Sequence, residues 1–256
     1  MNILHNVHSS LSAYFNKLLK AFSVINFKHL AFSLKPCPLH GSSVFVKLDE
    51  SMLGVRCCIC GAAPIATSIA TVLHDQVPDY KMNAHYELSS RGPFFEFLKK
   101  NVIDLTFSEF LDDVTPGDCR NGVQCQDIQN LTYNDTSFDV VTCTEVFEHV
   151  PDDASGFAEV FRVLRSGGVF IFTVPLFPAE GTVTRAVLEN DGIKYLLAPA
   201  YHDDSIRGAG KVLVFRDYGL DIQERLVSAG FEDVEIVNVP DSGGFGFIRE
   251  VVVAHK

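Results

Sequence analysis

The sequence has no uninterrupted run of about 18 uncharged apolar residues, the minimum for a helix that spans a bilayer. It has no aspartate or glutamate before Asp49, although the whole chain carries a net charge of -11. The N-terminus lacks arginine and the ordered segments of a secretory signal, so neither a mitochondrial presequence nor a secretory signal is expected. Seven cysteines, an odd number, do not suggest a disulfide framework and favour a reducing cytoplasm.

What is present is a mid-sized chain of 256 residues, 47% hydrophobic and 21% charged, enough for one α/β domain with attachments. The acidic balance argues against nucleic acid as a partner, because nucleic-acid binding needs a basic surface. Five lysines precede Asp49, so the sequence predicts a basic arm on an acidic body.

The chain divides into three segments. Residues 1–36 form a basic amphipathic arm, with apolar residues at helical spacing: Leu11, Phe15, Leu18, Phe22 and Ile25. Such a helix could lie on an anionic membrane surface, but docking on its own domain is the commoner outcome. Residues 37–81 hold a cysteine and histidine segment, a candidate zinc module, and residues 82–256 alternate strand and helix patterns to the end.

That alternation predicts a largely parallel, doubly wound sheet. Residues 177–218 interrupt it as a long polar insertion. The last two strands are joined by a short glycine-rich turn and must therefore pair antiparallel. The expected strands are 83–89, 102–110, 123–128, 138–143, 169–174, 234–239 and 247–254.

Residues 124–175 contain the clearest strand, helix and strand unit. The apolar run from Phe138 to Cys143 is typical of a parallel strand covered on both faces. Asp152 and Asp153 indicate a helix start, and Gly167 with Gly168 indicates its end. Polar residues follow the first strand, where open α/β sheets bind their ligands.

Carboxylates also follow neighbouring strands. Glu109 ends the second predicted strand, the position where paired hydrogen bonds would hold a ribose diol. Asp127 lies at the end of the third. The pattern indicates a cofactor that contains adenosine.

At this point the chain resembles the class I S-adenosylmethionine-dependent methyltransferases over about residues 82–256. The matching words are D-I-x-x-L from Asp127, S-F-D-V-V from Ser137, E-H-V-P-D from Glu148 and R-V-L-R-x-G-G from Arg162. The resemblance implies a Rossmann-like sheet of seven strands with an antiparallel last strand. It also implies S-adenosylmethionine as cofactor, bound by Glu87, Ser89, Ser90, Gly92, Glu109, Asp127, Ile128 and Thr144.

Within that set, the resemblance gives Glu109 the ribose hydroxyls, Asp127 the adenine amino group and Thr144 the methionine moiety. The loop after the first strand departs from the family, because Glu87 to Gly92 has one glycine where the family has three. This counts against a nicotinamide enzyme, whose pyrophosphate needs glycines. S-adenosylmethionine has no phosphate, so serines and an arginine could hold its carboxylate and ammonium.

Two histidines are candidate catalytic bases. His149 follows the fourth strand, and His202 lies in the insertion within a polar cluster of Tyr201, Asp203 and Asp204. Each has a plainer interpretation, as a loop hydrogen-bonding residue or a surface turn. The trio Glu145, Glu148 and His149 also resembles the divalent-metal cluster of some quinone-type O-methyltransferases.

The cysteine segment has the spacing of a structural zinc site. Cys37 and His40 form C-x-x-H, and Cys57 and Cys60 form C-x-x-C. Cys58 competes as a ligand, and buried thiols packed as small hydrophobic groups are the alternative.

The sequence therefore predicts methyl transfer from S-adenosylmethionine to an oxygen or nitrogen of a small-molecule acceptor. A sugar, quinone, lipid or amine acceptor is equally compatible with it. The competing hypothesis is a catalytically silent adenosyl-fold protein, in which the zinc-like module and the basic arm mediate assembly.

Overall fold

The computed structural model describes residues 28–178, 181–204 and 210–256, and its centre is one large sheet. The strand order is β16-β17-β9-β8-β4-β5-β7-β6. The strands are β4 (Ala84–Glu87), β5 (Asp104–Glu109), β6 (Cys119–Arg120), β7 (Val123–Cys125), β8 (Phe138–Thr144), β9 (Leu164–Thr173), β16 (Asp233–Pro240) and β17 (Ile248–His255).

Strands β9, β8, β4, β5 and β7 are parallel to their neighbours in that series. Strand β17 runs antiparallel to both β9 and β16, so the reversed last strand is confirmed. The two-residue β6 pairs antiparallel with β7 and adds an eighth strand at the edge, which the sequence did not predict.

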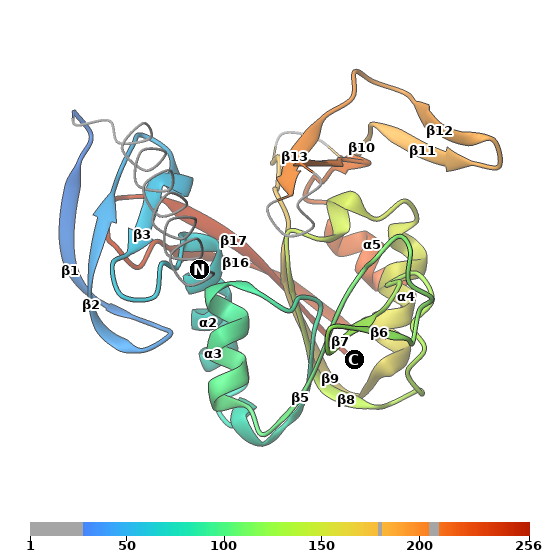
Figure 1. The fold of residues 1–256 in the computed structure, drawn as a ribbon, viewed down its shortest axis with the longest axis horizontal. Coiled ribbons are helices and arrows are strands. Elements are labelled where there is room, and N and C mark those ends of the chain that lie inside the picture. Colours follow the sequence, from blue (N-terminus) through green and yellow to red (C-terminus); the bar gives the residue numbers. More distant parts are fainter. Residues whose placement is uncertain (1–27, 179–180, 205–209) are drawn as a thin grey trace, which may run out of the picture.

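Helices cover both faces of the sheet (Figure 1). Helices α2 (Pro64–Gln76) and α3 (Gly92–Asn101) pack in one core, and α4 (Asp153–Val163) and α5 (Ile222–Ser228) in the other. Strand β9 shows why a core forms on each face of the sheet: Val169 and Ile171 enter the first core, while Phe170 and Phe172 enter the second. Successive side chains of a strand point to opposite faces, so a continuous apolar strand needs helices on both.

Helix α4 begins where the sequence indicated, because the Asp152 carboxylate accepts a hydrogen bond from the Ser155 backbone N–H at 3.2 Å. The predicted end was wrong. The helix stops at Val163, and β9 begins at Leu164, ahead of the glycines at 167 and 168. Leu164 is fully buried and pairs with Phe138 of β8, so the chain becomes extended as soon as that contact is made.

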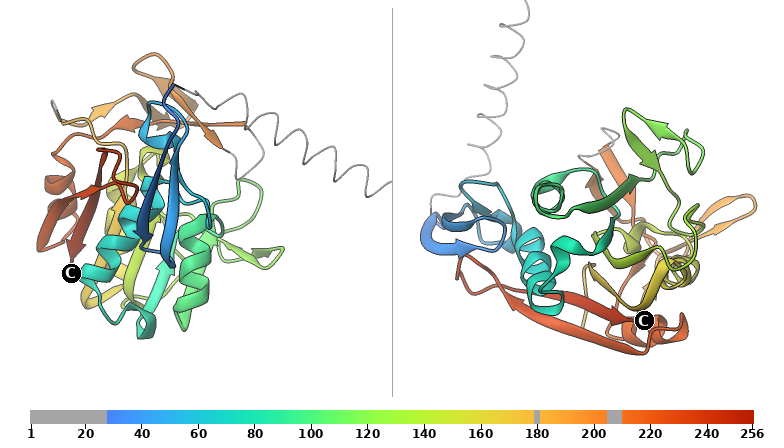
Figure 2. Two further views of the ribbon diagram at one scale, coloured as in Figure 1. Left: turned by 90° about the vertical axis from the view of Figure 1, so that its left-hand side faces the viewer. Right: turned by 90° about the horizontal axis from the view of Figure 1, so that it is seen from below.

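The cysteine segment forms a separate three-stranded sheet (Figure 2). Its strands are β1 (Ala31–Cys37), β2 (Gly41–Lys47) and β3 (Val55–Cys57). Phe45 and Val55 belong to the same core as Ile69 of α2. Helix α2 itself packs on β9, β16 and β17, so the cover of the central sheet starts well before residue 82. The five helically spaced apolar residues of the predicted arm lie outside the described residues, and β1 occupies the end of the arm.

In its described residues, the insertion forms three antiparallel strand pairs at one end of the central sheet (Figure 1). They are β10 (Val183–Thr184) with β15 (Arg216–Asp217), β11 (Ala186–Glu189) with β12 (Gly192–Tyr195), and β13 (Tyr201–Asp204) with β14 (Gly210–Leu213). Short 3-10 helices span Met52–Gly54, Tyr80–Met82 and Phe147–His149. Among the helices in the described ranges, none is long and apolar enough to cross a membrane.

Candidate active site

A cavity of about 430 Å³ lies at the carboxyl ends of the parallel strands. Strand-end residues form one side, and the insertion forms the other. Four residues that the sequence singled out line it: Glu109, Asp127, Ile128 and His149. The remaining lining residues include Tyr86, Ser108, Gln126, Gln129, Val146, Leu188, Ile193, Val212, Leu213 and Phe215.

Glu109 connects the cavity to the loop that follows β4. Its carboxylate accepts hydrogen bonds from the Ser90 backbone N–H at 2.8 Å and from the Ser90 hydroxyl at 2.9 Å. The loop enters α3 at Gly92, whose φ of +90° favours glycine. Ser89, Ser90 and Gly92 do not line the cavity themselves. They lie beside it, and Ser90 is held there by Glu109.

Glu87 is fully buried behind that loop and does not reach the cavity. Burial raises the pKa of its carboxyl to about 8. Ser89 Oγ donates to the carboxyl at 2.8 Å, and Thr142 shares a short hydrogen bond with it. Thr142 also contacts His85 Nε2 at 2.7 Å, and burial lowers the pKa of His85 to about 3. The buried Glu87 carboxyl therefore holds the Ser89 side chain in place.

Asp127 and Ile128 border the cavity after β7. Asp127 Oδ1 accepts hydrogen bonds from the backbone N–H and the side-chain amide of Gln129, at 2.9 and 3.0 Å. Gln129 in turn accepts from the backbone N–H of Asp152 at 2.9 Å, which ties this turn to the start of α4. Thr144, by contrast, ends β8 outside the cavity lining.

Three side chains converge where the loop after β8 meets the insertion. The distances are 3.7 Å from Glu148 Oε1 to His149 Nε2, 3.5 Å from Glu148 Oε1 to His202 Nδ1, and 3.2 Å between those two nitrogens. His149 Nδ1 donates to the Leu213 carbonyl at 2.8 Å, so Nε2 of the neutral ring carries the lone pair. The structure thus brings together two histidines that lie far apart in the sequence.

Glu148 is 1% exposed, and burial raises its pKa to about 7. The nearby Glu148 carboxylate raises the pKa of His202. Glu145 turns away from this group. It accepts from Thr173 Oγ1 at 2.8 Å and forms an ion pair with Arg249.

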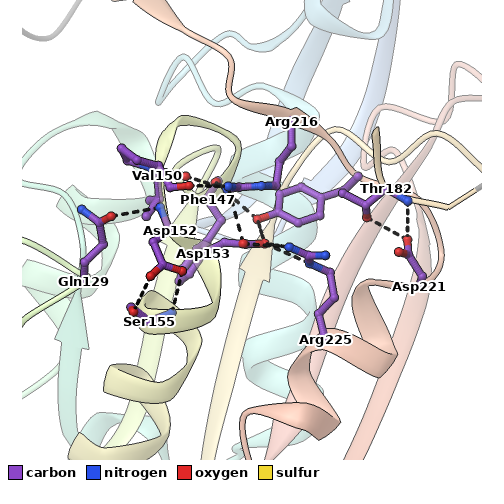
Figure 3. Close-up of polar contacts among 12 residues, drawn as sticks. Gln129, Phe147, Val150, Asp152, Asp153, Ser155, Thr182, Arg216, Asp221 and Arg225 are labelled. Carbon is purple, nitrogen blue, oxygen red and sulfur yellow. Dashed lines mark hydrogen bonds and ion pairs between the residues drawn. The ribbon is translucent and has the colours of Figure 1, made fainter. Parts of the chain in front are cut away.

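A buried cluster holds the loop that carries Glu148 and His149 (Figure 3). Arg216, 4% exposed, donates to the carbonyl oxygens of Phe147, Val150 and Pro151 at 3.3, 2.5 and 2.6 Å. Asp153 beside it accepts from the Tyr218 hydroxyl at 2.9 Å and pairs with Arg225 at 2.8 Å. No sequence signal pointed to Arg216, because only folding brings β15 against the loop.

The cysteine segment gathers its four expected ligands. Cys37 Sγ lies 3.9 Å from Cys60 Sγ, and His40 Nε2 lies 3.2 Å from Cys57 Sγ. All four donor atoms lie within 4.8 Å of one another. Cys58 is exposed and stands outside the group, so it does not compete.

The residues missed by the sequence fall into two kinds. Ser108 and Gln126 each precede a predicted carboxylate, so the strand-end rule could have found them. Leu188, Ile193 and Val212 come from the insertion, whose hairpins leave no local pattern that places them over the strand ends.

Comparisons with known proteins find similarity to methyltransferases. Residues 89–172 match a family model described as a methyltransferase domain. The chain is 32% identical over 94 residues to a sarcosine/dimethylglycine N-methyltransferase of Halorhodospira halochloris, a match that covers 35% of this chain and 33% of that protein. It is 38% identical over 90 residues to a ubiquinone biosynthesis O-methyltransferase of Pseudomonas paraeruginosa, covering 34% and 38%. The matched regions thus span only about a third of these relatives.

Two solved structures are also similar to this chain. One is an S-adenosylmethionine-dependent methyltransferase of Mesorhizobium loti, with 15% identity, a TM-score of 0.46 and coverage of 73% of this chain and 97% of that one. The other is a Burkholderia thailandensis 1,6-didemethyltoxoflavin-N1-methyltransferase, solved with its substrate and S-adenosylhomocysteine. It shows 16% identity, a TM-score of 0.45 and coverage of 75% and 78%.

Proposed function

Because residues 89–172 match a methyltransferase-domain family model, we propose that this chain is a class I S-adenosylmethionine-dependent methyltransferase and that it methylates an oxygen or nitrogen atom of a small-molecule acceptor. The observation that supports this most is that one cavity at the carboxyl ends of the strands is lined by residues from both expected ends of the site. The cavity joins Glu109, Asp127 and Ile128 to His149, and so joins the expected cofactor end to the expected acceptor end.

At the cofactor end, we assign Glu109 to the ribose hydroxyls, and Asp127 with Ile128 to the adenine. Glu109 uses one carboxylate oxygen for Ser90, and a carboxylate has further acceptor capacity for a diol. The loop from Ser89 to Gly92 would hold the methionine carboxylate and ammonium. Glu87 then acts as a positioning residue, because it touches Ser89 and lies outside the cavity.

At the acceptor end, His149 is the group best placed to accept a proton. Its Nε2 carries a lone pair, and its ring borders the cavity. The acceptor atom would attack the methyl carbon as the carbon–sulfur bond breaks, with S-adenosylhomocysteine as the leaving group, and His149 would take the proton that the acceptor loses. The cofactor supplies the activated methyl group, and the protein mainly aligns the two reactants.

The insertion fits an acceptor with an apolar body. Leu188, Ile193, Val212, Leu213 and Phe215 all line the cavity. The charge of -11 is consistent with an acceptor other than nucleic acid. The odd number of cysteines favours a reducing compartment, and on that ground we place the reaction in the cytoplasm.

Calorimetric titration of the full chain with S-adenosylhomocysteine tests the cofactor assignment. Glu109→Ala should weaken binding by about 10- to 150-fold, the equivalent of losing about 1.5–3 kcal/mol of hydrogen bonding to a charged group. Asp104→Ala is the matched control, because Asp104 is exposed at the opposite end of the same strand. If the wild-type chain does not bind, or Glu109→Ala binds as the wild type does, the silent assembly protein becomes the better hypothesis.

We also propose that Cys37, His40, Cys57 and Cys60 hold a structural zinc ion. Three thiolates and one imidazole are a zinc donor set, and sulfur atoms 3.9 Å apart suit ligands of one tetrahedral ion. Four protein ligands leave no open position, so the ion would stabilise the three-stranded sheet against α2 and take no part in methyl transfer.

A further inference from the structure

The triangle of Glu148 Oε1, His149 Nε2 and His202 Nδ1 has the dimensions of a metal site. Zinc ligands at 2.0–2.2 Å in tetrahedral positions lie about 3.3–3.6 Å from each other. The three separations here are 3.2, 3.5 and 3.7 Å. We propose that Glu148, His149 and His202 bind a divalent cation at the acceptor end of the cavity.

The state of Glu148 is the second observation that points to a ligand. Its side chain is 1% exposed, and the contacts of its Oε1 are the long ones to His149 and His202, at 3.7 and 3.5 Å, so neither carboxylate oxygen has a well-formed hydrogen bond among the described residues. An unsatisfied buried carboxylate is costly unless it pairs with a charge or coordinates a metal. A cation between the two imidazoles would satisfy it.

The surroundings of His149 are those of a metal ligand. Its Nδ1 donates to the Leu213 carbonyl, which fixes the ring with Nε2 facing Glu148 and His202. His202 comes from β13, and its partner in register on β14 is Val212, which lines the cavity with Leu213. The insertion therefore supplies one ligand and orients another.

Glu145 is not part of this site. Its carboxylate is engaged by Thr173 and Arg249. The trio predicted from resemblance, Glu145 with Glu148 and His149, is thus replaced by a trio in which His202 stands in for Glu145.

Three protein ligands leave coordination positions open, as in catalytic sites. This inference rests on the proposed function and narrows its acceptor to one that offers a hydroxyl oxygen. The cation would bind that oxygen and ease the loss of its proton to solvent, after which the oxygen attacks the methyl carbon and the thioether leaves. With the cation bound, His149 would act as a metal ligand, and solvent would take the proton of the acceptor hydroxyl in its place.

Manganese is the probe that separates this site from the cysteine site, because soft thiolates select zinc whereas carboxylate and imidazole accept manganese. Zinc-loaded full-length protein is titrated with Mn²⁺, and free Mn²⁺ is followed by electron paramagnetic resonance. We expect one bound ion per chain. His202→Asn and Glu148→Gln should each weaken binding at least about 10-fold.

Glu145→Gln is the discriminating control and should bind manganese as the wild type does. Zinc content by elemental analysis is the second measurement, with two ions per chain expected for the wild type and one for His202→Asn. No manganese binding together with a single zinc, or equal binding by all variants, overturns the site.

Titration of the same preparations with S-adenosylhomocysteine keeps this inference apart from the proposed function. Variants that bind the cofactor product but not manganese are folded and support the site. If the wild-type protein binds manganese but not S-adenosylhomocysteine, the metal site is supported and the methyltransferase assignment is refuted.

Discussion

Arg216 offers the sharpest test of how the active-site loop is held. Its guanidinium is buried and donates to the carbonyls of Phe147, Val150 and Pro151, which flank Glu148 and His149. In Arg216→Met the aliphatic volume remains, but the donors are lost. Phe147 keeps a second donor in the Tyr218 hydroxyl at 3.3 Å, so Val150 and Pro151 lose the most.

A hydrogen bond to a charged group contributes about 1.5–3 kcal/mol, and an unsatisfied buried carbonyl costs about 1–3 kcal/mol. Water can reach the half-buried Pro151 carbonyl, which leaves a net loss of roughly 3 kcal/mol. For a chain of this size that corresponds to a melting temperature about 6–12 °C lower. Asp153 is not left unpaired, because Tyr218 and Arg225 still contact it.

Differential scanning calorimetry with and without S-adenosylhomocysteine measures the effect. Arg225→Met is the comparison: Arg225 also binds Asp153, but its side chain is 34% exposed, so it should lower the melting temperature by less than half as much. If the two variants melt alike, or Arg216→Met melts as the wild type does, the carbonyl contacts do not hold the loop.

Glu87 should make stability depend on pH. Because burial raises its folded pKa to about 8 from an unfolded value of 4.5, the native state holds the extra proton between these values, and stability falls as pH rises through them. The free energy of unfolding should fall by the order of 3–5 kcal/mol by pH 8. Urea titrations at pH 5–8 measure it, and Glu87→Gln should flatten its dependence on pH. If the Gln variant keeps the wild-type pH dependence, another group causes it. For the cysteine site, Cys57→Ser should remove one zinc ion per chain and lower the melting temperature. Cys58→Ser changes an exposed thiol and should do neither. If both variants contain the same amount of zinc, the thiols serve only as packing in the core.

Much of the fold could be predicted because its signals are local. Continuous apolar runs such as Phe138–Cys143 specify strands covered on both faces, and the polar turn at Asp152 caps the helix that follows. The short turn between the last two strands forces their antiparallel pairing. The end of α4 was misplaced because the tertiary contact of Leu164 decides it.

The site divides along the same physical line. The carboxyl ends of parallel strands meet at one edge of a sheet, so the positions of Glu109, Asp127 and His149 at strand ends were enough to predict that they share a cavity. The spacing of the cysteine and histidine residues was enough to group the four candidate zinc ligands, Cys37, His40, Cys57 and Cys60. Only the tertiary structure could place the insertion over that edge, where His202 meets Glu148 and Arg216 meets the loop carbonyls. These contacts join segments about fifty or more residues apart, and no local periodicity or turn chemistry encodes them, because they depend on how the hairpins pack once the sheet exists.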